Sequence, residues 1–174
     1  MNPRQKKMPD DSPLFLVGFM GAGKTTVGRA LARELKYAFF DLDELIAIAT
    51  GKSVQEIFAE LGEAEFRRHE SNAIHCCRDM VCTVIALGGG AYVSEQNRDS
   101  LRAIGKTVWL DCPLEVCLKR IGGDKSRPLL GDEDEMRALL AQRRAAYAQA
   151  DYSVRVGKLS PEELVHEITT LLGK

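Results

Sequence analysis

The chain carries Gly18-Phe19-Met20-Gly21-Ala22-Gly23-Lys24-Thr25 between an apolar run at 14–17 and a helical pattern at 24–35. The order strand, glycine-rich loop, helix distinguishes a phosphate-binding loop from an isolated glycine-rich turn. Glycines let successive backbone N–H groups turn toward one anion, and the N-terminus of the helix adds partial positive charge. Lys24 can reach the β and γ phosphates, and the Thr25 hydroxyl can bind Mg²⁺. The segment therefore predicts binding of a nucleoside triphosphate.

Composition narrows the class of protein. The chain has 174 residues, of which 45% are apolar and 28% charged, and a formal net charge of -1. That length predicts one domain, and the balanced charge gives no electrostatic reason to expect nucleic acid or a membrane surface as partner. The polar N-terminus lacks the apolar stretch of a signal peptide, and no apolar run approaches the ~20 residues of a membrane span. We expect a cytoplasmic monomer with a disordered tail at 1–12 and a single domain at 13–174.

The five cysteines, Cys76, Cys77, Cys82, Cys112 and Cys117, are odd in number and match no zinc-binding spacing. They are expected to be reduced, small apolar residues of a cytosolic protein.

Apolar runs alternate with helical patterns along the chain. Strands are predicted at 14–17, 38–40, 83–87, 107–110 and 153–156, and helices at 24–35, 43–50, 54–60, 63–79, 94–103, 114–121, 132–148 and 161–172. Capping boxes at 53–56 and 160–163 mark two helix starts. Short strands separated by helices predict a parallel sheet covered on both faces, in one α/β domain.

Two segments interrupt this alternation. The stretch 122–134 is rich in glycine and charge and lies between two helices, which suits either a mobile lid over the nucleotide or an exposed connection. Gly88-Gly89-Gly90 follows a strand end, where open α/β sheets bind their ligands. Three glycines permit close approach of backbone to substrate, whereas a plain sharp turn requires only one or two.

Acidic and basic residues stand near these segments. Asp41 and Asp43 follow the second strand, and on an extended strand end both carboxylates point to one side. They suit a Mg²⁺ ligand and a proton acceptor, or equally a helix N-cap. Arg67 and Glu70 share a helix face, where Glu70 can orient the guanidinium for capture of a carboxylate. Taken alone, the stretch that contains Arg67 and Glu70 favours a solvated charged helix face over a carboxylate-binding site.

In combination these motifs resemble the shikimate kinase family, small phosphate-loop proteins similar to nucleoside monophosphate kinases. The resemblance covers nearly the whole chain from residue 14. It rests on the loop at 18–25, Asp41-x-Asp43, Phe66-Arg67-Arg68-x-Glu70, the glycine triplet, Arg127-Pro128-Leu129-Leu130, and Arg143 four residues before Tyr147. It implies a three-layer α/β/α fold with five parallel strands in the order 2-3-1-4-5 and a mobile lid.

On the nucleotide side, the resemblance implies that ATP is bound by Gly21, Ala22, Gly23, Lys24, Thr25, Thr26, Arg120 and Arg127. Arg120 would lie against adenine, and Arg127 would reach the phosphates from the lid. Thr25 and Asp41 would hold Mg²⁺, the latter through water.

On the acceptor side, it implies that shikimate is bound by Asp43, Phe58, Phe66, Arg67, Gly88, Gly89, Gly90 and Arg143. Asp43 would be the base, and Arg67 and Arg143 would clamp the carboxylate. Gly89 and Gly90 would supply backbone donors, and the two phenylalanines would form an apolar wall. The catalytic residues implied are Lys24, Asp43 and Arg127.

The expected reaction is ATP-dependent phosphorylation of the 3-hydroxyl of shikimate, giving shikimate 3-phosphate and ADP, on the route to chorismate and the aromatic amino acids. Gluconate and nucleotide kinases share the fold and loop. The segment after Asp43 lacks the histidine typical of gluconate kinases, and no pocket for a second base is evident. A non-catalytic nucleotide-binding module would be favoured if Lys24 or Asp43 were missing, and both are present.

Overall fold

The computed structural model describes residues 11–121 and 133–174. One sheet of five parallel strands has the order β2-β3-β1-β4-β5, which confirms the predicted order. The strands are β1 (Leu14–Val17), β2 (Ala38–Asp41), β3 (Thr83–Ala86), β4 (Lys106–Asp111) and β5 (Tyr152–Arg155). The helices are α1 (Lys24–Leu35), α2 (Leu42–Thr50), α3 (Val54–Cys76), α4 (Glu95–Ile104), α5 (Leu114–Ile121), α6 (Glu133–Tyr147) and α7 (Pro161–Leu172), with short 3-10 turns η1 (Cys77–Asp79) and η2 (Ala91–Val93).

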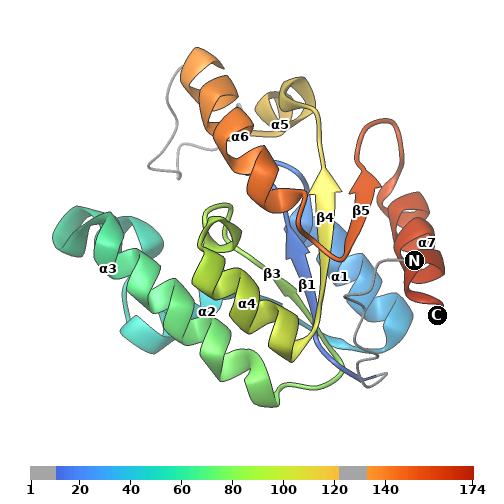
Figure 1. The fold of residues 1–174 in the computed structure, drawn as a ribbon, viewed down its shortest axis with the longest axis horizontal. Helices are drawn as coiled ribbons and strands as arrows, with labels where there is room; N and C mark the ends of the chain where they lie inside the picture. The colour runs from blue at the N-terminus through green and yellow to red at the C-terminus, as the bar shows by residue number, and fades with distance from the viewer. Residues whose placement is uncertain (1–10, 122–132) are drawn as a thin grey trace.

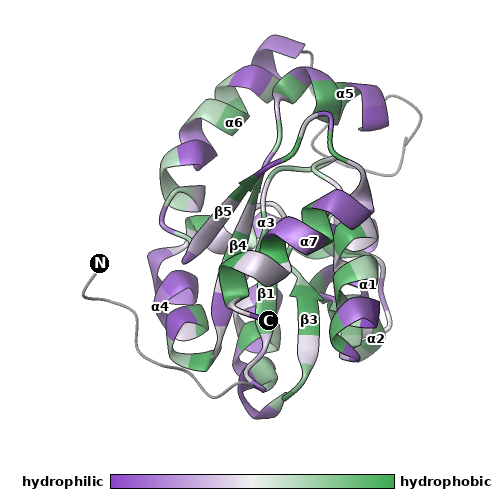
Figure 2. Cartoon of the chain, turned by 90° about the vertical axis from the view of Figure 1, so that its right-hand side faces the viewer, coloured by the Kyte–Doolittle hydropathy of each residue, from purple (hydrophilic) through white to green (hydrophobic). Residues whose placement is uncertain are grey.

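The helices cover both faces of the sheet, as expected for parallel strands. Helices α1 and α7 lie together on one side, and α4 with the second half of α3 lies on the other (Figure 1). Strand β1 is at the centre of the sheet and every one of its residues is buried. Apolar residues concentrate on the strands and on the helix surfaces turned toward them (Figure 2). The sheet thus forms the middle layer of a three-layer core.

The register of the strands brings their carboxyl ends to one level. Leu16 of β1 pairs with Ala86 of β3, and Ala86 pairs in turn with Asp41 of β2. The segments that follow these three strands therefore begin at the same edge of the sheet. They are the glycine-rich loop, the start of α2 and the glycine triplet.

Helix α3 joins two helices across a kink, which agrees with the two helices predicted at 54–60 and 63–79. The helix is kinked at Gly62, whose φ of 82° and ψ of 172° are not helical. It ends at Cys76, and η1 occupies the last residues of the predicted second helix. Both predicted capping boxes form, with Ser53 paired to Glu56 and Ser160 to Glu163.

The ends of the predicted segments lie partly outside the described residues. Asp11 and Ser12, expected in the tail, are described: the Asp11 carbonyl accepts a hydrogen bond from the Cys82 N–H at 2.7 Å, and Ser12 is buried. Glu133 and Asp134, expected at the end of the lid, are the first residues of α6. The rest of the expected lid, 122–132, lies outside the described residues.

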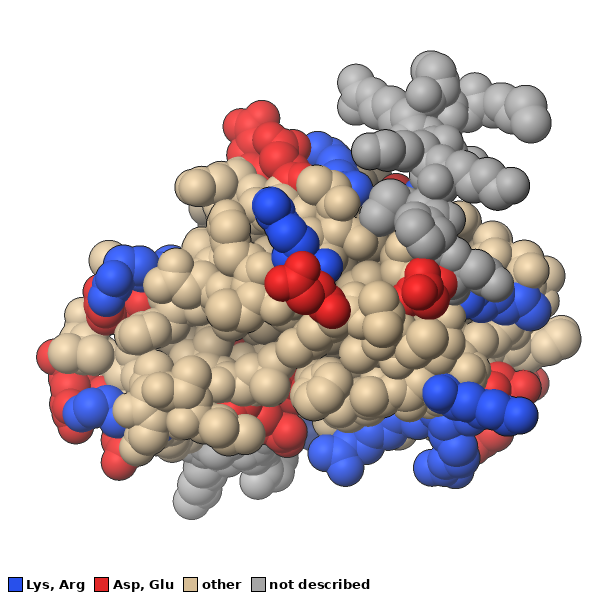
Figure 3. All heavy atoms as spheres, turned by 90° about the horizontal axis from the view of Figure 1, so that it is seen from below, with Lys and Arg blue, Asp and Glu red and all other residues tan. Residues whose placement is uncertain are grey.

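The structure also shows the distribution of surface charge, the state of the cysteines and whether any helix could span a membrane. Acidic and basic side chains are both present on the face seen in Figure 3. All five cysteines are free thiols. Within 11–121 and 133–174, no helix combines the length and apolar character that crossing a membrane requires.

Candidate active site

The glycine-rich loop connects β1 to α1 and leaves the N-terminus of that helix open. Gly23 is the N-cap, with a left-handed φ of 93°, and no side chain caps the helix. The first turn of α1 contains no acidic residue, so its backbone N–H groups and dipole favour an external anion. The Lys24 ammonium donates hydrogen bonds to the carbonyls of Gly18 and Phe19 at 2.9 and 3.0 Å. The lysine is thus folded along the concave side of the loop.

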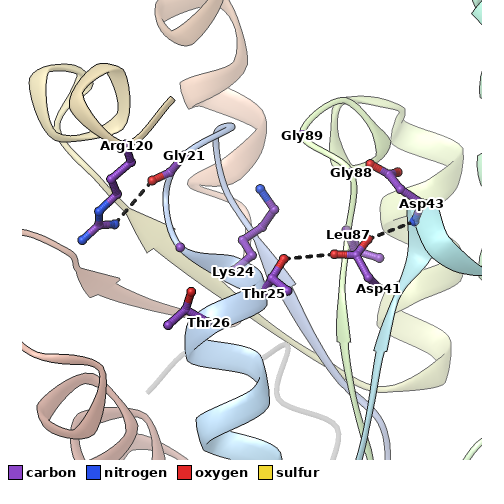
Figure 4. Close-up of a pocket in the computed structure, with 11 residues that line it drawn as sticks. Gly21, Lys24, Thr25, Thr26, Asp41, Asp43, Leu87, Gly88, Gly89 and Arg120 are labelled. Carbon is purple, nitrogen blue, oxygen red and sulfur yellow. Dashed lines mark hydrogen bonds between the residues drawn. The ribbon is translucent and has the colours of Figure 1, made fainter. Parts of the chain in front are cut away.

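Asp41 links the loop to the next strand. The Thr25 hydroxyl donates to Asp41 Oδ2 at 3.0 Å, and Asp41 Oδ1 accepts from the backbone N–H of Asp43 at 3.1 Å (Figure 4). Asp41 is therefore the N-cap of α2 and a partner of Thr25 at the same time. The two interpretations that the sequence left open for Asp41 are compatible.

The prediction that Asp41 and Asp43 share an extended strand end was wrong. Strand β2 ends at Asp41, and Asp43 lies in the first turn of α2. The cap explains this difference, because a carboxylate that accepts the Asp43 N–H starts the helix directly after Asp41. Asp43 is consequently presented from a helix N-terminus.

These groups surround a pocket of 460 Å³. Its lining comes from the loop and α1, the β2–α2 junction, the segment after β3, and α5: Gly21, Gly23, Lys24, Thr25, Thr26, Asp41, Asp43, Leu87, Gly88, Gly89 and Arg120 (Figure 4). All but Leu87 were predicted as site residues. Leu87 is an apolar residue directly before the triplet, and nothing in its residue type marks it as functional.

The remaining predicted residues lie outside that lining. Ala22 is buried beneath the loop. Gly90 is the last residue of the triplet, and Arg67 and Arg143 lie against Gly90 and Gly89. Phe58 and Phe66 lie on α3. Arg127 is outside the described residues.

Each glycine of the triplet packs against a different polar side chain. A Cβ on Gly88 would lie 2.8 Å from Asp43 Oδ1 and 2.7 Å from Glu70 Oε1. A Cβ on Gly89 would lie 3.3 Å from Nη1 of Arg143, and one on Gly90 would lie 2.6 Å from Cζ of Arg67. Contacts below 3.0 Å leave no room for a side chain, so the absence of Cβ atoms lets these groups close on the turn.

Arg67 and Glu70 form a partly buried ion pair on α3. Arg67 Nη1 lies 2.6 Å from Glu70 Oε2, and Nη2 lies 2.8 Å from Glu63 Oε1. The Glu70 side chain is 0% exposed and that of Arg67 is 30% exposed. This placement differs from the solvated charged face that the stretch alone favoured.

The charges around Glu70 offset only in part the rise in its pKa that burial causes. Burial raises the pKa of Glu70; Arg67 lowers it, the negative charge of Asp43 raises it, and Arg143 lowers it. Burial also acts to lower the pKa of Arg67, but the nearby Glu70 and Glu63 carboxylates more than offset this and the pKa is raised. Among the described residues, Glu70 Oε1 has no hydrogen-bond partner. Glu70 therefore interacts electrostatically with Asp43 as well as with Arg67. The spacing of the sequence did not indicate the interaction with Asp43.

The Phe66 ring lies beside Arg67 of this pair and packs on the Phe58 ring. The Phe58 and Phe66 rings pack with centroids 4.8 Å apart and planes inclined by 39°. The Arg67 guanidinium lies 5.4 Å from the centroid of the Phe66 ring. The rings give the guanidinium an apolar support next to the carboxylates.

Arg143 approaches from the opposite side, on α6. Its side chain is nearly buried, at 7% exposure, and its guanidinium lies 6.0 Å from the centroid of the Phe19 ring. Tyr147, one helical turn further along α6, donates its hydroxyl hydrogen to the Gly89 carbonyl. The triplet is thus enclosed by α3 on one side and α6 on the other.

Arg120 of α5 contacts the phosphate loop itself. Its Nη1 donates to the carbonyls of Ala22 at 3.2 Å and Gly21 at 3.4 Å. Its expected contact with adenine stays a prediction.

No cluster of three or more His, Cys, Asp or Glu side chains in the part of the chain that the structure describes could hold a metal ion. Oxygen ligands for Mg²⁺ are nevertheless close together at Thr25 and Asp41. Mg²⁺ typically takes one or two carboxylates and completes its shell with phosphates and water. The donor set therefore fits a magnesium ion that binds with the nucleotide.

Comparisons with known proteins agree with this arrangement. A protein-family model described as shikimate kinase matches residues 20–172. The chain is 44% identical to a shikimate kinase of Microcystis aeruginosa over 163 residues, 91% of this chain and 85% of the relative. It is 43% identical to one of Geobacter sulfurreducens over 166 residues, 94% of this chain and 92% of the relative.

Solved structures give the same result. A shikimate kinase from Acinetobacter baumannii in complex with shikimate is 36% identical, with a TM-score of 0.89, over 94% of this chain and 97% of that one. A gluconokinase from Sinorhizobium meliloti is 16% identical with a TM-score of 0.54, over 95% of this chain and 94% of that one, a likeness of fold alone.

Proposed function

The chain belongs to the shikimate kinase family, and on this premise we propose that its pocket transfers the γ-phosphoryl group of ATP to the 3-hydroxyl of shikimate. The observation that supports the pocket assignment is the packing of the glycine triplet. Beside a phosphate loop, it gathers two carboxylates, from Asp43 and from the Glu70 that pairs with Arg67, and two guanidiniums, from Arg67 and Arg143. An acceptor that carries one carboxylate and several hydroxyls complements these charges.

The nucleotide binds at the loop in this proposal. Backbone N–H groups at the start of α1 hold the phosphates, and the Lys24 ammonium neutralises the β and γ phosphates. Arg120, already in contact with the loop carbonyls, borders the nucleotide. Arg127, from outside the described residues, completes the charge stabilisation.

Thr25 and Asp41 hold Mg²⁺ in the proposed complex. When bound, the ion neutralises charge on the β and γ phosphate oxygens. The hydrogen bond of 3.0 Å between Thr25 and Asp41 keeps a hydroxyl and a carboxylate oxygen together beside the loop.

On the acceptor side, Asp43 accepts the proton of the attacking hydroxyl. The hydroxyl oxygen bonds to the γ-phosphorus, and the bond between the γ-phosphorus and the β-phosphate oxygen breaks, which releases ADP. Arg67 and Arg143 bind the carboxylate by charge-assisted hydrogen bonds. Phe58 and Phe66 contact the apolar face of the ring, and the triplet brings backbone donors close. The residues of the protein position the substrates and stabilise charge, and the bonds that form and break belong to the substrates.

We also propose that the enzyme works as a cytoplasmic monomer with a single domain at 13–174, and that its partners are small molecules only. The balanced charge supports the absence of nucleic acid and membrane partners.

Release of ADP tests the proposed function directly. The protein is supplied with Mg-ATP and, in parallel, shikimate, gluconate, AMP or no acceptor. Turnover with shikimate alone is the expected result. Turnover with another acceptor would reject the carboxylate clamp as described, and tight ATP binding without turnover would support a non-catalytic module.

A further inference from the structure

Tyr147 ties the last turn of α6 to the glycine triplet. Its side chain is fully buried, and its hydroxyl donates a hydrogen bond to the Gly89 carbonyl, 58 residues earlier in the chain. Burial raises the pKa of Tyr147 to about 12, and the nearby Arg143 opposes that rise. The hydroxyl therefore keeps its proton at neutral pH and remains a donor. Removing it would take this donor from the carbonyl of Gly89, a half-buried residue, so the link constrains the turn.

The hydrogen bond fixes the orientation of one peptide plane. The carbonyls of Gly88 and Gly90 accept hydrogen bonds from backbone N–H groups three residues further on, at 3.1 and 3.0 Å. Tyr147 provides the corresponding partner for Gly89. In a planar trans peptide the N–H points away from the C=O. Holding the Gly89 carbonyl toward α6 therefore directs the Gly90 N–H to the opposite side.

A glycine peptide needs such an anchor more than others do. Without Cβ atoms, Gly89 and Gly90 have access to backbone conformations that other residues avoid. The side-chain hydroxyl of Tyr147 removes this freedom from outside the turn.

Arg143 depends on the same contact. It lies four residues before Tyr147, so both side chains project from one face of α6. Its Nη1 is 3.3 Å from the position of a Cβ on Gly89, whose carbonyl Tyr147 holds. The hydroxyl bond thus sets how closely α6, and with it the guanidinium, approaches the turn.

We propose that Tyr147 is a positioning residue for recognition of the acceptor carboxylate. Its hydroxyl holds the turn at Gly89 against α6 and so sets the placement in which the Arg143 guanidinium donates to that carboxylate. The inference rests on the proposed function, in which that carboxylate belongs to the acceptor.

Tyr147→Phe removes the hydroxyl and keeps the ring. We expect a rise of about five- to tenfold in the KM for shikimate, as for loss of a neutral hydrogen bond. The kcat and the KM for ATP should change by less than about twofold, because the hydrogen bond that is lost goes to Gly89 and not to the phosphate loop or Asp43.

Tyr92→Phe is the matched control. Tyr92 is also fully buried, and its hydroxyl contacts the Thr107 hydroxyl at 3.4 Å instead of the triplet. This variant should leave the KM for shikimate unchanged. An equal rise in both variants, or a rise in the KM for ATP as large as that for shikimate, would overturn the positioning role in favour of a general packing effect.

A readout without substrate separates this inference from the proposed function. In ¹⁵N NMR spectra of the free protein, Tyr147→Phe should shift the Gly90 amide and the Arg143 Nε resonances, while Tyr92→Phe leaves both in place. Unmoved resonances would refute the positioning role even if shikimate proves not to be the acceptor. Failure of wild-type turnover with shikimate, together with the expected NMR shifts, would reject the proposed function alone.

If Tyr147→Phe does not fold, Gly89→Ala tests the same contact between the turn and Arg143. Its methyl group would press on Nη1 of Arg143 at 3.3 Å, so the guanidinium has to yield by a few tenths of an ångström. We expect a raised KM for shikimate and a shifted Arg143 Nε resonance. An Arg143 resonance and KM that both match the wild type would contradict the proposed placement.

Discussion

Gly90→Ala would move one arginine without straining the backbone. Gly90 has φ -96° and ψ -20°, a conformation that alanine adopts readily. The new Cβ would lie 2.6 Å from both Cζ and Nη2 of Arg67. Because non-bonded carbon atoms settle at about 3.5–4.0 Å, the guanidinium has to retreat by about 1 Å. The substitution is therefore a displacement of Arg67 rather than a change in the fold of the turn.

The size of the effect follows from what holds Arg67. The fully buried Glu70 and the exposed Glu63 both form ion pairs with the guanidinium, so it cannot swing freely. A 1 Å misplacement of a substrate-positioning group can reduce activity by about 10²-fold. Loss of a hydrogen bond to a charged group is worth about 1.5–3 kcal/mol, or about 10- to 150-fold at 1.4 kcal/mol per factor of ten. We expect the KM for shikimate to rise about 10- to 100-fold.

Steady-state ADP release, with shikimate and ATP varied separately, measures this change. The KM for ATP should stay near the wild-type value, since Arg67 does not line the nucleotide pocket. Gly173→Ala is the control: it adds the same methyl group where nothing lies within 4 Å, at a left-handed C-cap of α7 that alanine strains. It should lower the melting temperature without changing either KM. A wild-type KM for shikimate in folded Gly90→Ala would refute the assignment of Arg67 to the carboxylate.

Three further substitutions test the other groups. Asp43→Asn should greatly reduce turnover and leave the ATP affinity measured by calorimetry nearly intact, because only the acceptor loses its base; an equal loss of ATP affinity would contradict that assignment. Arg143→Ala should raise the KM for shikimate by the equivalent of about 1.5–3 kcal/mol, and an unchanged KM would remove Arg143 from the clamp. Thr25→Ala should raise the Mg²⁺ concentration for half-maximal ADP release, since its hydroxyl faces the Asp41 carboxylate; an unaltered magnesium titration would show that Thr25 is not a ligand.

The parts of the fold that depend on near neighbours in sequence were predictable. The capping boxes at Ser53 and Ser160 need only a glutamate three residues later, and both form. The loop at 18–25 was identified from the strand before it and the helix after it, which are equally local. The order of the sheet is not local, and it was expected from the family resemblance alone.

The placement of charged side chains depended on distant residues and was harder to predict. Arg67 and Glu70 were correctly expected to share a helix face, but the stretch gave no sign that Glu70 is fully buried. That burial comes from packing against the segment after β3, whose Gly88 lies directly on Glu70 Oε1. Asp43 was misplaced for a related reason, because the cap made by Asp41 converts an expected strand end into a helix start.

The triplet explains why this site needs three glycines where a turn needs fewer. Gly88 admits the carboxylates of Asp43 and Glu70, and Gly90 admits the guanidinium of Arg67. Gly89 stands between the two halves of the site: its Cβ position is 3.3 Å from Arg143 and 3.7 Å from both the Gly18 carbonyl and the Met20 N–H nitrogen. Gly89 therefore places no side chain of its own between the phosphate loop and the groups proposed to bind the acceptor. Phosphoryl transfer requires its two substrates to be in line and close, and the bare backbone of this turn allows their binding groups to converge.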